Sequence, residues 1–326
     1  GAVALGRSGL ACAPVGVGTL AWGDAGRGFG ERFGEGELRE AFHAALPPEG
    51  GAPGAAPVLF DTAEVYGYRS GALGLSAEHL IGKFLQEGGG ISTQRALVGS
   101  KVFPVPWTNL LVGGGVRLGR KALVKALKAS VDRMGGRQLD LWSIHFPFPT
   151  FKQQALMEAL QEGYELGLAR AVGVSNYSAA QLEEAAELLE RAGGPPMAAH
   201  QCRFSVLDRG AEADGRLEAA GRLGIATVAY EPLAQGRLAE GGGAREGDSE
   251  RAEKLGQLVQ VMQFIGAVNG GKTVAQVALG YAVAKGCVPI PGCASAARAA
   301  ELDLGGWLLD ENEVAIVEEK LEFLEL

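Results

Sequence analysis

Short apolar runs alternate with longer amphipathic stretches along most of this chain of 326 residues. The runs are continuous and lack the two-residue alternation of a strand with one face in water. Continuous apolar runs of about four to eight residues are typical of strands whose two faces are both covered. The predicted strands are residues 15–18, 58–61, 97–101, 139–145, 169–174, 198–202, 225–230 and 287–290.

The stretches between these runs carry apolar residues at helical spacing. A helix between two successive strands makes a crossover, so the strands should form a parallel sheet. We therefore predict an α/β fold, a (β/α)8 TIM barrel of eight parallel strands with surrounding helices, in a single domain over residues 1–326. The predicted helices lie near residues 37–46, 77–87, 119–133, 152–166, 179–192, 211–223 and 273–285.

An open doubly wound sheet is the alternative, because residues 16–21 (Gly-Val-Gly-Thr-Leu-Ala) match the fingerprint G-x-G-x-x-A. In dinucleotide-binding folds this fingerprint opens a helix, and a second strand ends in an acidic residue about 20 residues later. Here the glycine-rich residues 22–28 do not open a helix, and no such acid follows. The barrel is therefore favoured. Residues 47–57 and 241–250 are rich in glycine and are expected to form surface loops.

Composition narrows the classes of partner. The net charge is −8 at pH 7, which disfavours binding to the negatively charged phosphate backbone of a nucleic acid. No apolar run approaches the roughly 20 residues that span a bilayer, so we expect neither nucleic acid nor a membrane as partner. The four cysteines are scattered, with no histidines at ligand spacing. Buried free thiols, and no metal site, are expected.

Four residues that bind or transfer protons stand at or just after the ends of three successive predicted strands. Asp61, Lys101 and His145 each end a strand, and Tyr66 follows Asp61 in the next loop. The carboxyl ends of neighbouring parallel strands share one face, so the four side chains should meet. Each residue separately has an ordinary structural explanation, but their shared position favours a catalytic cluster.

This set suits the reduction of a carbonyl group. Tyr66 can donate a proton to the developing alkoxide, although a tyrosine pKa of about 10 is poorly matched to neutral pH. A nearby ammonium stabilises the phenolate, so Lys101 should lower the pKa of Tyr66. Asp61 would keep Lys101 charged and oriented, and His145 would polarise the carbonyl or orient the substrate.

The motifs around these residues resemble those of the aldo-keto reductases. Residues 61–67 (Asp-Thr-Ala-Glu-Val-Tyr-Gly) are similar to the family motif D-T-A-x-x-Y-G, and in that family a lysine and a histidine end the third and fourth strands. Four more family motifs lie in the expected order along the chain, one before residues 61–67 and three after them. They are Gly-Val-Gly-Thr at 16–19, Gly-Val-Ser-Asn at 173–176, Tyr-Glu-Pro-Leu-Ala-Gln-Gly at 230–236 and Ile-Pro-Gly at 290–292. The resemblance therefore extends over nearly the whole chain.

The resemblance implies that NADP lies across the mouth of the barrel. Ser175, Asn176 and Gln201 would hold the carboxamide, and Tyr230 would stack on the nicotinamide ring. Residues 231–237 would follow the pyrophosphate. The full set of residues expected to contact the cofactor is Gly18, Thr19, Leu20, Asp61, Ser175, Asn176, Gln201, Tyr230, Glu231, Pro232, Leu233, Gln235, Gly236, Arg237, Pro291, Gly292, Arg298 and Glu301.

Three departures from the family pattern concern the cofactor. Relatives commonly carry a basic residue and an asparagine where this chain has Ala294 and Leu302, and a serine where it has Glu231. Residues 241–243 are glycines where many relatives have a basic loop. Arg298 remains at a position where the family often places an arginine on the 2′-phosphate. NADP stays favoured over NAD, with weaker binding expected.

Aromatic residues in the loops after the first, third and fourth strands should line the substrate pocket. Trp22, Phe103, Trp107 and Phe146 are the expected residues. Aromatic walls around a polar centre suit small aldehydes and ketones, including aromatic ones. The expected partner is thus a small carbonyl substrate, and the chain is expected to act as a monomer.

Two other functions stay open at this point. One is a nucleotide-sensing regulatory subunit, since some relatives keep the four residues, bind cofactor and serve as partners of channels. The other is a barrel that isomerises or hydrolyses sugars, which would usually show paired carboxylates or a metal cluster. The motifs around Asp61, Lys101 and Trp107 resemble plant and algal plastid members, so we expect the chloroplast stroma, with a transit peptide ahead of Gly1, or alternatively the cytoplasm.

Overall fold

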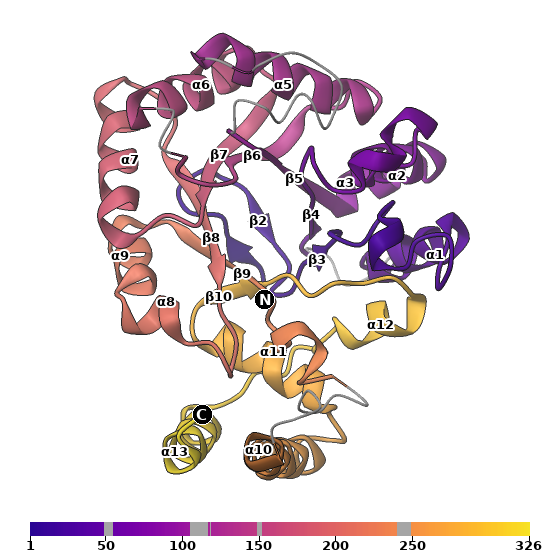
Figure 1. Cartoon of the computed structure of the whole chain (residues 1–326), viewed down its shortest axis with the longest axis vertical. Coiled ribbons are helices and arrows are strands. Elements are labelled where there is room, and N and C mark those ends of the chain that lie inside the picture. The colour runs from indigo at the N-terminus through magenta and orange to yellow at the C-terminus, as the bar shows by residue number, and fades with distance from the viewer. Residues whose placement is uncertain (49–54, 105–116, 118, 149–151, 240–248) are drawn as a thin grey trace.

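A computed structural model of the chain describes residues 1–48, 55–104, 117, 119–148, 152–239 and 249–326. Within these residues, eight strands pair in parallel in the order β10-β9-β8-β7-β6-β5-β4-β3. They lie at the centre of the molecule (Figure 1). The strands are β3 (Val17–Gly18), β4 (Val58–Asp61), β5 (Ala96–Val102), β6 (Leu139–Ile144), β7 (Ala169–Ser175), β8 (Met197–Arg203), β9 (Ala226–Tyr230) and β10 (Cys287–Pro289).

The first and last strands meet and close the sheet into a barrel. Gly18 and Gly292 form a parallel bridge. The Gly16 N–H donates to the Pro289 carbonyl oxygen at 2.9 Å, and the Gly18 N–H donates to the Pro291 carbonyl oxygen at 2.8 Å. The (β/α)8 barrel predicted from the sequence is confirmed.

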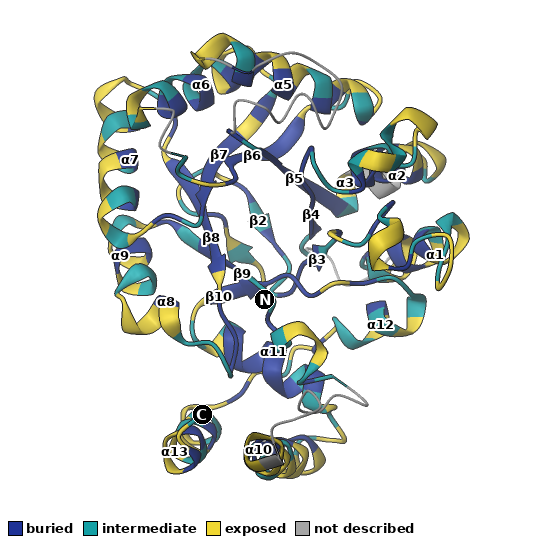
Figure 2. Cartoon of the chain, in the orientation of Figure 1, coloured by how far each residue is buried: buried dark blue, intermediate teal, exposed yellow. Residues whose placement is uncertain are grey.

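The helices surround the barrel, with buried faces turned toward the strands and exposed faces outward (Figure 2). Their starts carry the expected capping residues: Ser178 and Gln181 form a capping box at α7, and Thr273 and Gln276 form one at α11. The described helices are α1 (Glu35–Ala45), α2 (Ala77–Glu87), α3 (Gly89–Arg95), α5 (Gly119–Arg133), α6 (Gln153–Glu165), α7 (Ala179–Arg191), α8 (Gly210–Ala213), α9 (Arg216–Leu223), α10 (Ser249–Val268), α11 (Val274–Ala284), α12 (Ala296–Glu301) and α13 (Glu311–Leu324). Short 3₁₀ turns add η1 (Ala25–Arg27), η2 (Tyr68–Leu73) and η3 (Ala234–Gly236).

A hairpin that the sequence reasoning missed joins the core inside the barrel. Strands β1 (Val3–Ala4) and β2 (Ala11–Cys12) pair antiparallel. Leu5 and Leu10 beside them pack with the residues inside the barrel. Gly6 has φ +56°, and a Cβ there would lie 2.7 Å from a carbonyl oxygen of β8. Glycine therefore allows the hairpin to approach the barrel closely.

Two long helices were also missed. Helices α10 and α13 pack beside α11, apart from the barrel (Figure 1), and the Lys320 ammonium donates to Gln257 Oε1 at 3.0 Å between them. Most of the predicted loops 47–57 and 241–250 lies outside the described residues, and Ser249 and Glu250 already belong to α10. No described helix has an apolar stretch long enough to cross a membrane.

Candidate active site

Asp61 and Lys101 form a buried ion pair at one end of the barrel. Asp61 ends β4, Lys101 lies near the end of β5, and the strand register places Asp61 opposite Gly99. The Lys101 ammonium donates to Asp61 Oδ2 at 2.6 Å and to the Thr62 carbonyl oxygen at 2.9 Å. The two side chains are 2% and 7% exposed. Two hydrogen bonds to one ammonium fix its position.

Tyr66 and His145 lie around this pair. The Lys101 nitrogen is 5.1 Å from the centroid of the Tyr66 ring, and the Tyr66 and His145 rings stand edge to face with centroids 6.0 Å apart. The chain thus brings together all four residues that the sequence predicted as catalytic. His145 directly follows β6, and Tyr66 follows β4 by five residues.

Burial has the largest effect on the pKa of Tyr66 and raises it, while the charge of Lys101 opposes this shift only in part. The pKa of Tyr66 therefore stays above its ordinary value. The expected lowering by Lys101 is present, but the cost of desolvating a phenolate exceeds it. Tyr66 is protonated at neutral pH, which is the form that donates a proton.

At neutral pH, Lys101 is charged and His145 is neutral. Burial lowers the pKa of Lys101, but the charges of Asp61 and Tyr66 outweigh it, so the pKa is raised. Burial, followed by the charge of Lys101, holds the pKa of His145 well below its ordinary value. Its Nδ1 is buried and has no hydrogen-bond partner within the described residues. A neutral imidazole carries one N–H donor and one acceptor nitrogen.

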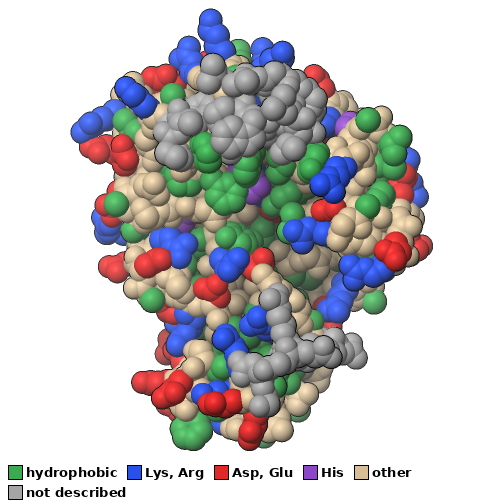
Figure 3. Space-filling view, viewed as in Figure 1, with side chains coloured by type: hydrophobic (Ala, Val, Ile, Leu, Met, Phe, Trp, Pro, Cys, Tyr) green, Lys and Arg blue, Asp and Glu red, His purple; other side chains and the backbone are tan. Residues whose placement is uncertain are grey.

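A cavity of about 680 Å³ opens above these residues. Asp61, Tyr66 and His145 line it, together with all the residues predicted to contact the cofactor except Arg237 and Glu301. In Figure 3, hydrophobic side chains and a histidine gather in the central hollow of the face shown, with Lys and Arg side chains around it. Segments far apart in the sequence therefore converge on one cavity.

Polar side chains on the cavity wall hold one another. Asn176 Nδ2 donates to Ser175 Oγ at 3.1 Å, and the Tyr230 hydroxyl donates to Asn176 Oδ1 at 2.8 Å. Gln201 Nε2 donates to Asp61 Oδ1 at 2.7 Å. The amides predicted to hold a carboxamide are thus adjacent to the Asp61–Lys101 pair and already ordered.

The backbone around the cavity adopts conformations that side chains rarely favour. Asn176, Glu231 and Gln235 have φ of 62°, 55° and 60° and all line the cavity. Left-handed backbone at non-glycine residues concentrates at functional sites. Glu231 Oε2 lies 3.3 Å from Arg203 Nε, so the unusual acid at this position has a cationic neighbour that the sequence did not reveal.

Arg298, in helix α12, lines the cavity. Its side chain is 43% exposed, and its guanidinium lies 3.6 Å from the Glu301 carboxylate. Glu301 itself does not line the cavity, and neither does Arg237, which follows η3. Of Arg237, Arg298 and Glu301, Arg298 is therefore the one that lines the cavity.

Phe146 is the predicted substrate residue that lines the cavity, with 37% exposure. Its ring stacks on His145 with centroids 4.8 Å apart. Phe103 does not line the cavity but stands edge-on to His145, with centroids 5.4 Å apart. Trp107 lies outside the described residues.

Trp22 was predicted to contact the substrate, but the structure places it in the core. The side chain is 0% exposed and packs edge-on against Phe84. Its indole N–H donates to the Cys293 carbonyl oxygen at 2.7 Å, and Cys293 does line the cavity. Trp22 therefore holds the loop after β10 through its N–H. Its large apolar ring is more stable in the core than in a pocket open to water.

All four cysteines are free and buried, as predicted.

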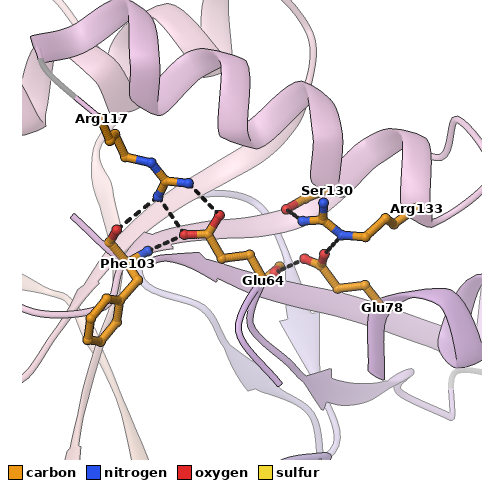
Figure 4. A network of polar contacts seen from close by, with 7 residues as sticks. Glu64, Glu78, Phe103, Arg117, Ser130 and Arg133 are labelled. Carbon is orange, nitrogen blue, oxygen red and sulfur yellow. Dashed lines mark hydrogen bonds and ion pairs between the residues drawn. The ribbon is translucent and has the colours of Figure 1, made fainter. Parts of the chain in front are cut away.

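A second buried ion pair supports the loop that carries Tyr66 (Figure 4). Arg117 donates through Nη1 and Nη2 to the two Glu64 oxygens at 2.7 and 3.0 Å, and both side chains are at most 2% exposed. The Phe103 N–H donates to Glu64 Oε1 at 2.6 Å, and its carbonyl accepts from Arg117 Nη1 at 2.8 Å. Sequence reasoning missed this pair, although Glu64 lies inside the motif at 61–67.

A neighbouring network of hydrogen bonds is centred on Glu78 and includes Ser100, the residue before Lys101 (Figure 4). The Ser100 hydroxyl donates to Glu78 Oε1 at 2.5 Å, and Arg133 Nε donates to Glu78 Oε2 at 2.5 Å. Glu78 and Ser100 are each 1% exposed. The segment before Lys101 is therefore tied to α2 and α5 by charge-assisted hydrogen bonds.

The Aldo/keto reductase family model matches residues 14–322. The chain belongs to the aldo/keto reductase family. It is 33% identical over 318 residues to the chloroplastic pyridoxal reductase of Arabidopsis thaliana. This alignment covers 93% of this chain and 82% of that protein. It is 29% identical over 299 residues to a 6-dehydroglucose reductase of Novosphingobium aromaticivorans, covering 91% of this chain and 87% of that protein.

The fold agrees with this membership. The crystal structure of a thermostable aldo-keto reductase with the inhibitor epalrestat is similar, with a TM-score of 0.72 and 27% identity over 98% of this chain and 99% of that one. Family and relatives together support an oxidoreductase that acts on carbonyl groups with a nicotinamide nucleotide. They do not favour the regulatory alternative.

Proposed function

We propose that this protein is an NADPH-dependent carbonyl reductase in which Tyr66 donates the proton. The observation that carries this proposal is the buried Lys101–Asp61 pair, at 2.6 Å, directly behind the Tyr66 ring on the wall of one cavity. A proton donor needs a partner that stabilises the anion it becomes, and a buried ammonium at this distance serves that purpose.

The residues divide the work as follows. The Tyr66 hydroxyl gives its proton to the carbonyl oxygen, and Lys101 stabilises the phenolate that remains. Asp61 keeps Lys101 charged. His145, held neutral by burial, offers a hydrogen bond that orients the carbonyl. A bound nicotinamide nucleotide supplies the hydride for the carbonyl carbon, so that an aldehyde or ketone becomes an alcohol.

The cavity has the groups that such a cofactor needs. Asn176 and Gln201 present amides, Ser175 a hydroxyl and Tyr230 an aromatic ring, and all of them line the same cavity as Tyr66. The cavity volume of about 680 Å³ falls in the range of roughly 300–1,000 Å³ that is usual for ligand sites. We propose that the amides hold the carboxamide and that Tyr230 stacks on the ring.

The preference for NADPH over NADH rests on Arg298. A guanidinium makes two charge-assisted hydrogen bonds to one phosphate, and Arg298 lines the cavity with a half-exposed side chain. Arg298→Ala should weaken NADPH binding by roughly 1.5–3 kcal/mol. NADH, which lacks the 2′-phosphate, should bind equally well to both proteins. Titration of intrinsic tryptophan fluorescence measures the affinity of each coenzyme for each of the two proteins. Equal losses of affinity for NADPH and NADH would show that Arg298 does not bind the 2′-phosphate.

The substrate should be a small aldehyde or ketone, aromatic ones included. The stacked Phe146 and His145 rings form an apolar wall beside the proton donor. A relative bears the name pyridoxal reductase, which makes pyridoxal, an aromatic aldehyde, one candidate.

Turnover separates an enzyme from a nucleotide sensor. With aldehydes, ketones or pyridoxal present, each enzyme molecule should oxidise many molecules of NADPH, measured by the loss of NADPH absorbance. One molecule of alcohol should form for each NADPH oxidised. A protein that binds NADPH tightly but performs fewer than one turnover with every carbonyl of such a panel would be a sensor, and the proposed function would be wrong.

We further propose the chloroplast stroma as the compartment. The support is the plastid-type motif pattern and a relative whose name includes "chloroplastic". Fractionation of cells followed by immunodetection tests this, and recovery only in the cytoplasmic fraction would contradict it.

A further inference from the structure

A second cavity, of about 590 Å³, adjoins the first at Tyr66. Leu20 and Tyr66 line both cavities. The rest of the second cavity comes from residues 23–27 and 65–69, and none of the predicted cofactor residues except Leu20 lines it. Tyr66 therefore lies between the predicted cofactor site and a space in which the remainder of a substrate can lie.

Two arginine side chains give the second cavity its charge. Arg27 and Arg69 line it, and Asp24 is the one carboxylate among its described lining residues. Asp24 Oδ2 lies 3.4 Å from Arg27 Nε, and the two side chains are 34% and 52% exposed. Two guanidinium groups against one carboxylate leave a net positive charge.

Both guanidinium groups keep donors for a ligand. Arg69 Nε donates to the Tyr68 hydroxyl at 3.1 Å, and the guanidinium lies 5.7 Å from the centroid of that ring. In the described part of the chain, no carboxylate forms an ion pair with Arg69, and the Arg27 side chain donates no hydrogen bond. Arginine carries five N–H donors in a planar fork that matches carboxylate and phosphate oxygens.

The charge in this cavity reaches the proposed proton donor. Burial is the main influence on the pKa of Tyr66 and raises it, while Arg27, like Lys101, acts to lower it. A cation that acts on the Tyr66 hydroxyl is also close enough to attract an anion on a molecule held there.

We propose that the physiological substrate is a carbonyl compound with an anionic group, a carboxylate or a phosphate, which Arg27 and Arg69 bind while its carbonyl lies at Tyr66. This inference rests on the proposed function and narrows its substrate class. The two arginines select the substrate and take no part in transferring the proton.

Matched pairs of aldehydes test this inference, because each pair shares its carbonyl and differs in charge. Benzaldehyde is compared with 2-, 3- and 4-carboxybenzaldehyde, which place a carboxylate at three distances from the carbonyl. Glyceraldehyde is compared with glyceraldehyde 3-phosphate. The measured quantity is kcat/KM for each at saturating NADPH, at low and at high ionic strength.

Four variants are compared with the unmodified protein. Arg27→Gln and Arg69→Gln each remove one cation, and Asp24→Asn removes the opposing charge while keeping a side chain that caps η1. Arg191→Gln, on the exposed surface of α7, is the control for the loss of an arginine anywhere. Affinity for NADPH is measured for every variant, because the coenzyme is itself an anion.

Each arginine variant should lower kcat/KM for the charged aldehyde about tenfold, equivalent to about 1.4 kcal/mol. Arg69→Gln should leave kcat/KM for the neutral member unchanged. Arg27→Gln also removes a charge that acts on Tyr66, so for this variant the ratio of charged to neutral kcat/KM should fall about tenfold. The NADPH affinity should not change in either variant, and Asp24→Asn should improve kcat/KM for the charged substrate. High salt should reduce the preference for the charged member. A loss confined to the carboxylates or to the phosphate supports the site and identifies the anion.

Equal kcat/KM for charged and neutral members, unaffected by Arg27→Gln and Arg69→Gln, would overturn the anion site while leaving carbonyl reduction intact. A tenfold loss of NADPH affinity in these variants would also overturn it, because the arginines would then belong to the coenzyme site. If no aldehyde of either pair is reduced, the proposed function fails, and the anion site fails with it.

Discussion

Burial, more than any single charge, sets the protonation of Tyr66 and His145. Burial raises the pKa of Tyr66 and lowers that of His145, and the charge of Lys101 acts to lower both. The outcome at neutral pH is a protonated phenol beside a neutral imidazole. This pairing suits reduction, because the phenol gives a proton while the imidazole offers a hydrogen bond without a competing charge.

Lys101→Met should therefore lose most of the reductase activity and change its pH dependence. Reduction requires protonated Tyr66, so activity falls as the pH rises through the pKa of Tyr66. Without the cation that pKa rises further, and the alkaline limb should move to higher pH. Lys101→Arg, which keeps a charge, should hold the limb nearer its original position. An unchanged pH–rate profile in Lys101→Met, measured on protein shown to be folded, would make Lys101 a bystander.

These residues could be predicted from the sequence because each is a polar residue at, or shortly after, the end of an apolar run that predicts a strand. This pattern gave no information on which way a side chain turns. Trp22 follows a strand end like the proposed catalytic residues, yet its ring is wholly buried, and its N–H donates to the Cys293 carbonyl oxygen. The sequence did not single out Arg27 and Arg69, and only the folded chain places them around one cavity with Tyr66.

Between elements, the buried Glu64–Arg117 pair joins the loop after β4 to Arg117, two residues ahead of α5. Removing one partner of a buried ion pair leaves a charge without water or counterion, at a cost of about 3–5 kcal/mol. Glu64→Gln should lower the free energy of unfolding in urea by about that amount. Glu187→Gln, the same change in an exposed ion pair on α7, should have no measurable effect. Equal effects of the two substitutions would contradict the structural role of Glu64.

Elements were predictable where hydrophobic pattern and topology agree. The eight barrel strands appear as continuous apolar runs because helices cover their outer faces and the core fills the inside. Strands β1 and β2 have two residues each, too short for a periodic signal, and their hairpin depends on the close approach at Gly6. Helices α10 and α13 interrupt or follow the strand–helix alternation, so the topology gave no reason to expect them.

At the scale of the whole molecule, a second buried histidine links folding to pH. His200 in β8 is 0% exposed. Burial first, and then the charge of Arg216, lowers the pKa of His200 to about 4. The unfolded chain takes up this proton near pH 6.5. Between these values the unfolded state binds more protons, so stability falls as the pH falls.

The free energy of unfolding should drop by about 2 kcal/mol between about pH 7 and pH 5 from His200, following from its lowered pKa. Urea unfolding at a series of pH values measures the slope. His200→Gln keeps a polar side chain of similar size and should remove this part of the slope, while the carboxylates and His145 contribute equally to both proteins. Identical slopes would show that His200 is protonated in the folded state as easily as in the unfolded one.

The central claim is that Tyr66 donates the proton in carbonyl reduction. Its most direct test is single-turnover reduction of an aldehyde by enzyme saturated with NADPH, comparing Tyr66→Phe with the unmodified protein. Positioned acid catalysis contributes about 10² to 10⁴ in rate, so Tyr66→Phe should be slower by at least about 100-fold. NADPH affinity should be nearly unchanged, because the ring remains. A Tyr66→Phe enzyme that keeps more than about a tenth of the rate would contradict the account.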